Sequence, residues 1–250
     1  MLGDPYFWAA AVPAVVMIGL SKGGLGPLGG LAVPILALAI SPVQAAGLTL
    51  PIFVLSDIVA VVAYRRQFEP ALLKLMIPAA GAGILIGWST AAWVNDDAVR
   101  LIVGLVSVLF AVNYWLRGRL AQEPMKPSTP KGAFWGADAG FTSFVSHSGG
   151  APFQMYVLPL RLAPPVFAGT SVIFFAVVNA LKLPPYLLLG QFRTSNLMAA
   201  AILAPLSIVC ALFAVRLIKV IDQARFYRIV YVLMFAIGVF LIGQAAIDLT

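Results

Sequence analysis

Long apolar runs separated by glycine, proline and short polar stretches make up almost the whole chain. Many of these runs approach the length of about 20 residues with which a helix crosses a bilayer. They lack the alternation of apolar and polar residues that marks a membrane-spanning strand. The runs and their breakers predict ten helical segments, at about 6–20, 28–40, 43–64, 71–92, 98–116, 132–146, 152–162, 166–189, 197–217 and 225–246. The expected fold is all-α, a polytopic membrane helix bundle.

Composition supports a membrane protein and excludes several functional classes. Of the 250 residues, 62% are hydrophobic and 10% are charged, whereas about 25% are charged in a typical soluble domain. The net charge of +7 is therefore attributed to membrane topology and not to nucleic-acid binding. The single cysteine, Cys210, excludes an internal disulfide. No Walker A motif, GxGxxG motif or metal-ligand spacing occurs, so no bound cofactor and no metal are predicted.

Two of the predicted segments, 28–40 and 152–162, are too short to span a bilayer comfortably. Each follows a stretch rich in glycine that ends in proline, SKGGLGP at 21–27 and SHSGGAP at 146–152. These breakers predict helices that are broken or re-entrant.

A polar linker at 117–131 divides the chain into a first membrane repeat, 1–116, and a second, 132–250. When the two glycine stretches are aligned without a gap, serine pairs with serine, proline with proline and His147 with Lys22. The match predicts an internal repeat.

Charge indicates how the two halves are related. The loops at 65–74, 117–131 and 216–228 are rich in Lys and Arg and are assigned to the cytoplasm, while the acidic loop at 95–97 and both termini are assigned to the outside. This topology makes the halves inverted repeats with periplasmic termini. Inverted repeats are typical of secondary transporters, in which broken helices meet near the midplane and direct their N-terminal dipoles at an anion.

Lys22 and His147 are the principal candidates for substrate contacts, because each lies at a predicted helix break. A charge within the membrane is costly unless it faces a polar cavity, and a histidine can donate to an anion when charged. Lys22 snorkelling to the surface and His147 bonded to a freed carbonyl are the structural alternatives. Nearby hydroxyls and glycine amides complete the predicted anion site: Ser21, Gly23, Gly24, Ser146, Ser148, Gly149 and Gly150.

Asp57 and Lys182 lie inside predicted spanning segments. Intramembrane carboxylates usually serve ion pairing, proton transfer or cation binding. We therefore predict that Asp57 couples transport to an ion or neutralises Lys22 or Lys182, with a fixed structural ion pair as the alternative. Lys182 is expected either to pair with Asp57 or to snorkel.

Three other functions stay open on these residues. An intramembrane serine hydrolase would use His147 as base for a serine such as Ser21 or Ser171, and one serine substitution would abolish cleavage. An anion channel would conduct without saturating at one site. A cation transporter would depend on Asp57 and tolerate loss of Lys22.

The sequence also resembles the TauE/SafE family of membrane transporters, often called sulfite exporters. The similarity is carried by GLSKGGLGPLGGLAVPIL, SPVQAAGLTLPIFVLSDIVAVVAYRRQF, SFVSHSGGAPFQMYVLPLRL and GTSVIFFAVVNALK, in this order along nearly the whole chain. The resemblance implies a non-enzymatic transporter of the bacterial inner membrane that exports a small inorganic or organic sulfur oxyanion, such as sulfite or an organosulfonate. It leaves the exact anion, the coupling ion and homo-oligomerisation open.

Overall fold

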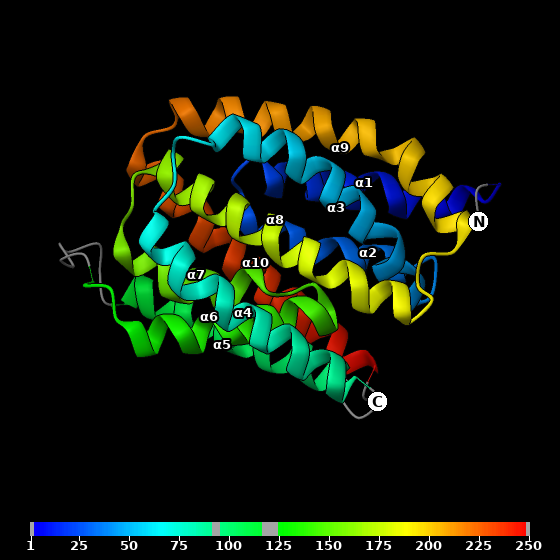
Figure 1. The fold of residues 1–250 in the computed structure, drawn as a ribbon, viewed down its shortest axis with the longest axis horizontal. Helices are drawn as coiled ribbons and strands as arrows, with labels where there is room; N and C mark the ends of the chain where they lie inside the picture. The colour runs from blue at the N-terminus through cyan, green and yellow to red at the C-terminus, as the bar shows by residue number, and fades with distance from the viewer. Residues whose placement is uncertain (1–2, 92–95, 117–124, 249–250) are drawn as a thin grey trace.

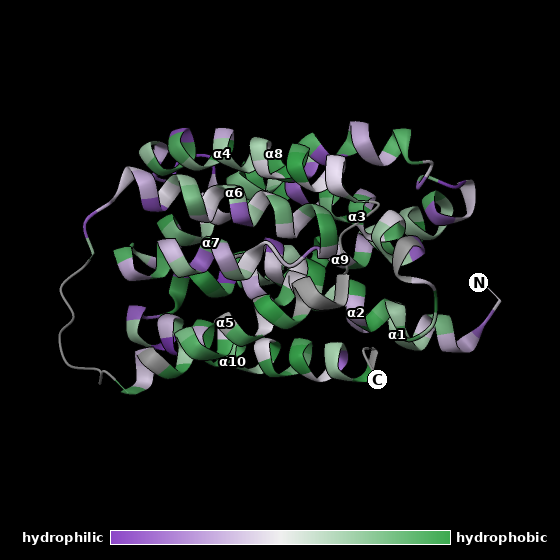
Figure 2. Ribbon diagram, turned by 90° about the horizontal axis from the view of Figure 1, so that it is seen from below, coloured by the Kyte–Doolittle hydropathy of each residue, from purple (hydrophilic) through white to green (hydrophobic). Residues whose placement is uncertain are grey.

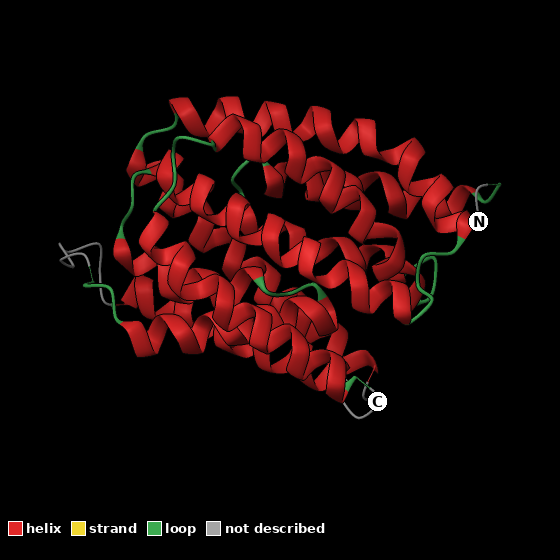
Figure 3. Cartoon of the chain, viewed as in Figure 1, coloured by secondary structure: helices red, strands yellow, loops and turns green. Residues whose placement is uncertain are grey.

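The computed structural model describes residues 3–91, 96–116 and 125–248, and helices form nearly all of these ranges without a strand (Figure 3). The predicted all-α fold is confirmed. In chain order the elements are α1 (Pro5–Lys22), the 3-10 helix η1 (Gly26–Leu31), α2 (Ala32–Ala37), α3 (Pro42–Tyr64), α4 (Pro70–Thr90), α5 (Asp96–Leu116), α6 (Thr129–Ser146), α7 (Gly150–Val157), the 3-10 helix η2 (Leu158–Leu160), α8 (Pro164–Leu188), α9 (Thr194–Val220) and α10 (Gln223–Asp248).

Six helices of the described chain are long and apolar enough to cross a membrane: α1, α3, α4, α8, α9 and α10. Hydrophobic residues cover long stretches of these helices in Figure 2. Large apolar side chains stand on the outer face, including Ile202, Val209 and Phe213 of α9, while Ser56 and Asn179 are buried. This distribution suits contact with lipid and not with water. The protein is therefore a multi-pass membrane protein.

Both predicted helix breaks are present. Helix α1 ends at Lys22, and Gly24 then adopts a φ of +121°, a conformation that favours glycine. Helix α6 ends at Ser146, and His147 follows in the left-handed conformation with φ +55°. Each broken helix folds back on itself, because α1 packs against η1 and α2, and α6 packs against α7.

The second half begins earlier than the sequence predicted. Helix α6 starts at Thr129 and not at residue 132, so the end of the predicted linker is helical. Pro130 lies in the first turn, where its missing N–H removes no helical hydrogen bond. The predicted linker residues 117–124 lie outside the described residues.

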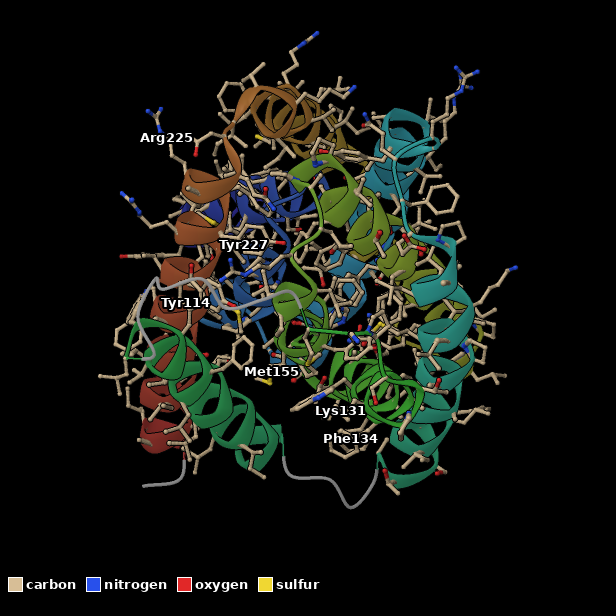
Figure 4. The ribbon with its side chains drawn as sticks, turned by 90° about the vertical axis from the view of Figure 1, so that its left-hand side faces the viewer. Tyr114, Lys131, Phe134, Met155, Arg225 and Tyr227 are labelled. Atoms are coloured by element: carbon tan, nitrogen blue, oxygen red, sulfur yellow. The ribbon has the colours of Figure 1, made fainter. Side chains whose placement is uncertain are left out.

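The basic connections gather at one end of the bundle. The α3–α4 and α9–α10 loops lie together at the left in Figure 1, and both chain ends lie at the right. Figure 4 looks onto the left-hand end, where Lys131 and Arg225 are labelled. In the described residues, the charge difference that the sequence predicts between the two sides of the membrane therefore corresponds to the two ends of the molecule.

The two halves of the chain pack across each other. The most extensive contacts join α4 to α6, α5 to α10, α1 to α9 and α3 to both α8 and α9. Small residues permit the closest of these approaches: Gly83 of α4 lies against the backbone of Ala137, and Gly140 of α6 against the backbone of Ala80. This interface is closed by backbone contact, so it has no room for a larger residue.

We expect Gly83→Ala to destabilise the protein by about 1–3 kcal/mol, because the added methyl group would overlap the Ala137 carbonyl oxygen. Gly81→Ala is the matched control, since the nearest atom to a methyl group there is Leu181 Cδ1 at 3.9 Å. Thermal unfolding of both variants in detergent measures the difference. Equal melting temperatures for the two variants would contradict the close α4–α6 packing.

Candidate functional site

A small cavity of about 40 Å³ lies where the two broken helices meet, enough for a few waters or one small ion. Its wall draws on both breaks and on the middle of α3 and α8. The lining residues are Ser21, Lys22, Gly26, Gly29, Gly30, Phe53, Ser143, His147, Gly150, Ser171, Val172, Phe175, Asn179 and Lys182. Residues distant in sequence thus converge on one buried polar space.

Lys22 forms a buried ion pair with Asp57 of α3. Its Nζ atom lies 2.7 Å from Asp57 Oδ1, and each of the two residues is 4% exposed. Asn179 of α8 donates from Nδ2 to the other carboxylate oxygen, Oδ2, at 2.8 Å. Asp57 is therefore held between a cation from the first half of the chain and an amide from the second.

Lys182 has neutral partners only. Its Nζ atom donates to the carbonyl oxygen and to the Oγ atom of Ser143, both at 3.1 Å, and it lies 3.4 Å from His147 Nδ1. The side chain is fully buried, and no carboxylate of the described residues pairs with it. Hydrogen bonds thus hold this buried group in place of a direct ion pair.

The partners of His147 fix its tautomer. A lysine ammonium group has no acceptor, so Nδ1 of His147 must accept from Lys182. Nε2 then carries the proton and donates to Tyr186 Oη at 2.8 Å, and Tyr186 in turn donates to the carbonyl of Phe144 at 3.2 Å. In this arrangement the imidazole ring is neutral and orients Lys182.

Aromatic rings form the apolar side of the cavity. Lys22 Nζ lies 4.9 Å from the ring centre of Phe53, and the ring of His147 stacks on Phe53 with centres 5.8 Å apart. A cation near the face of an aromatic ring is stabilised by the ring quadrupole. Phe53 therefore contacts both Lys22 and His147, the two residues that the sequence repeat aligns, and it adds no charge.

The cavity carries an excess of positive charge. Two lysines line it, and Asp57 is the one carboxylate of the described residues found in contact with either of them. Charges in a low-dielectric interior interact more strongly than in water. Such a site favours an anion, because an anion can pair with Lys182, which no carboxylate of the described residues contacts.

The structure brings some predicted site residues together and places others elsewhere. Ser21, Lys22, His147, Gly150 and Lys182 line the cavity. The Ser21 hydroxyl donates to the Ile18 carbonyl and retains its acceptor lone pairs.

The remaining predicted residues have local structural contacts. The amides of Gly23 and Gly24 bond to the carbonyls of Gly19 and Ser21, and a side chain at Gly23 would overlap Ala214 of α9. The Ser146 hydroxyl donates to Thr142 and that of Ser148 to Ser146. Gly149 lies against the backbone of Ala139.

Several cavity residues were not predicted as site residues, among them Ser143, Phe53 and Asn179. A signal for α8 exists in the sequence: Ser171, Phe175, Asn179 and Lys182 recur at the spacing of one helix face. Ser143 gave no comparable signal. It contacts Lys182 only because α6 and α8 lie side by side at this point.

The site does not present the geometry of a serine hydrolase. Both ring nitrogens of His147 are engaged, by Lys182 and by Tyr186, and neither bonds to a serine hydroxyl among the described residues. A nucleophilic serine requires a base within hydrogen-bonding reach.

Broken helices that meet around a buried polar site are a construction found in many secondary transporters. Comparison with protein families matches residues 11–241 to the family described as sulfite exporter TauE/SafE. The chain belongs to the TauE/SafE family, a family of membrane transporters. The comparisons with curated proteins and with solved structures find no match.

Proposed function

We propose that this protein exports a small sulfur-containing anion, sulfite or an organosulfonate, and binds it in the cavity between Lys22 and Lys182. The observation that carries the proposal is the charge of this cavity: two buried lysines face one buried carboxylate. The family's description as sulfite exporters supports sulfur oxyanions as the substrate class. Ser21, Ser171 and the glycines of η1 supply further polar contacts on the same wall.

The proposal includes alternating access by two inverted repeats, with α1–α5 as one and α6–α10 as the other. The pattern of contacts supports it. The contact of α1 with α9 corresponds to the contact of α6 with α4. The contact of α3 with α9 corresponds to the contact of α8 with α4, and the contact of η1 with α10 corresponds to the contact of α7 with α5. Rocking of one repeat against the other would open the cavity to each side in turn.

We further propose that the basic end lies in the bacterial cytoplasm and that both termini are periplasmic. Lysine and arginine gather in cytoplasmic loops. Arg65 and Arg161 lie in connections between helices, and Arg225 lies in the first turn of α10. An inside-negative potential then drives anion exit with about 2.3 kcal/mol per charge per 100 mV. Export in this orientation needs no coupling ion.

A binding titration tests the proposed site. The purified protein is heated with increasing sulfite, sulfate, thiosulfate or methanesulfonate, alongside Lys22→Ala and His147→Ala. We expect one sulfur anion to raise the melting temperature of the wild-type protein, because a ligand that binds only the native state stabilises it. Both variants should lose this rise. An absence of any anion-dependent rise in the wild-type protein would overturn the proposal and direct attention to cations.

A further inference from the structure

Gln154 of α7 is a buried polar side chain that takes no part in the Lys22–Asp57 ion pair or in the hydrogen bonds of Lys182. It is fully buried, and neither its Nε2 nor its Oε1 atom has a hydrogen-bond partner among the described residues. Buried amides are hydrogen-bonded in almost all proteins, because an unpaired one loses its water contacts without compensation. The amide of Gln154 therefore has both its donor and its acceptor available to a ligand.

The amide lies beside the cavity wall. A methyl group placed on Gly26 would stand 3.3 Å from Gln154 Nε2 and 3.2 Å from Ser171 Oγ, and one on Gly150 would stand 3.8 Å from the same Nε2. Gly26, Gly150 and Ser171 all line the cavity. The amide of Gln154 thus lies behind the part of the cavity wall that Gly26, Gly150 and Ser171 form.

We propose that Gln154 determines substrate specificity by recognising an O–H group on the bound anion. This inference rests on the proposed function. The lysines attract the negative charge of the anion. The side-chain amide of Gln154 instead offers an NH2 group that donates and a carbonyl oxygen that accepts. A fully ionised oxyanion has acceptors only and leaves Oε1 unpaired. A singly protonated oxyanion such as hydrogensulfite satisfies both amide atoms, which makes this class of anion the preferred substrate.

The test compares two anions of equal charge and similar size, hydrogensulfite and methanesulfonate, at a mildly acidic pH. Their affinities are measured by calorimetric titration for the wild-type protein and for Gln154→Met. We expect Gln154→Met to weaken hydrogensulfite binding about tenfold, the effect of losing one well-made pair of hydrogen bonds. Methanesulfonate, which has no O–H group, should bind the variant and the wild-type protein alike.

A stability measurement separates recognition from a structural role. Without anion, Gln154→Met should melt at the same temperature as the wild-type protein or higher, because methionine removes an unpaired buried amide at similar volume. Gln67→Met is the matched control. Its Oε1 atom is also buried without a partner, but Gln67 lies in the α3–α4 loop and not on the cavity. This control should keep wild-type affinities for both anions.

A second variant tests this part of the cavity wall. Gly26→Ala would place a methyl group between Ser171 and Gln154 and should also lower the preference for hydrogensulfite. Two results overturn the inference alone: unchanged hydrogensulfite affinity in Gln154→Met, or an equal loss of both anions together with a lower melting temperature. Failure of the wild-type protein to bind either anion would instead overturn the proposed function, and this inference with it.

Discussion

Lys182→Met is expected to abolish measurable anion binding while leaving the protein at least as stable as the wild type. Lys182 is fully buried, and its partners Ser143 and His147 are neutral. Removal of a charged group that pairs with a buried ligand costs about 2–5 kcal/mol of binding free energy. In the ligand-free protein, methionine removes a buried amine that has no direct ion-pair partner among the described residues and so relieves a desolvation cost.

The measurement is sulfite affinity and melting temperature for Lys182→Met beside Lys219→Met. Lys219 is exposed near the end of α9, so the control removes a lysine without altering the cavity. We expect the control to bind sulfite as the wild-type protein does. Wild-type affinity in Lys182→Met would show that the anion does not bind near this ammonium group.

Asp57→Asn should have the largest effect on stability. The substitution leaves Lys22 buried without its carboxylate partner at 2.7 Å, and breaking a buried ion pair from one side costs about 3–5 kcal/mol. A bound anion then supplies a negative charge near Lys22 in place of the carboxylate. Sulfite should therefore raise the melting temperature of Asp57→Asn by more than it raises that of the wild-type protein.

The double variant Lys22→Met, Asp57→Asn is the control for this prediction. It removes both members of the pair, so it should recover much of the lost stability, and it should lose the enhanced response to sulfite. A different pattern would support the cation-transport alternative. In that case Asp57→Asn would lose a cation-dependent rise in melting temperature, and sulfite would have no effect on either variant.

The helices and their breaks were predictable from the sequence because both depend on local composition. Apolar runs near the thickness of a bilayer form helices, and glycine with proline ends them. The structure accordingly has a short helix after each glycine stretch, at Gly26–Ala37 and at Gly150–Leu160. Helix ends were less predictable: Pro130 suits a first turn as well as a linker, and α6 starts before it.

The site was predictable only in part, because long-range packing chooses the partners. The sequence placed Asp57 and Lys182 inside membrane segments and Lys22 at a helix break, but it left open which lysine pairs with the carboxylate. The packing of α3 against α8 brings Asn179 within hydrogen-bonding distance of Asp57, and the contact of α6 with α8 does the same for Ser143 and Lys182. The sequence repeat aligned His147 with Lys22, yet the second cation of the cavity comes from α8 and His147 orients it.

Efflux of radiolabelled sulfite from proteoliposomes tests the central claim, anion transport through this cavity, most directly. Vesicles containing the wild-type protein, Lys182→Met or no protein are loaded with sulfite, and an inside-negative potential is imposed. We expect saturable efflux from wild-type vesicles that accelerates with the potential, and efflux at the protein-free rate from Lys182→Met vesicles. Equal efflux from wild-type and Lys182→Met vesicles, or no efflux above the protein-free rate, would contradict the account.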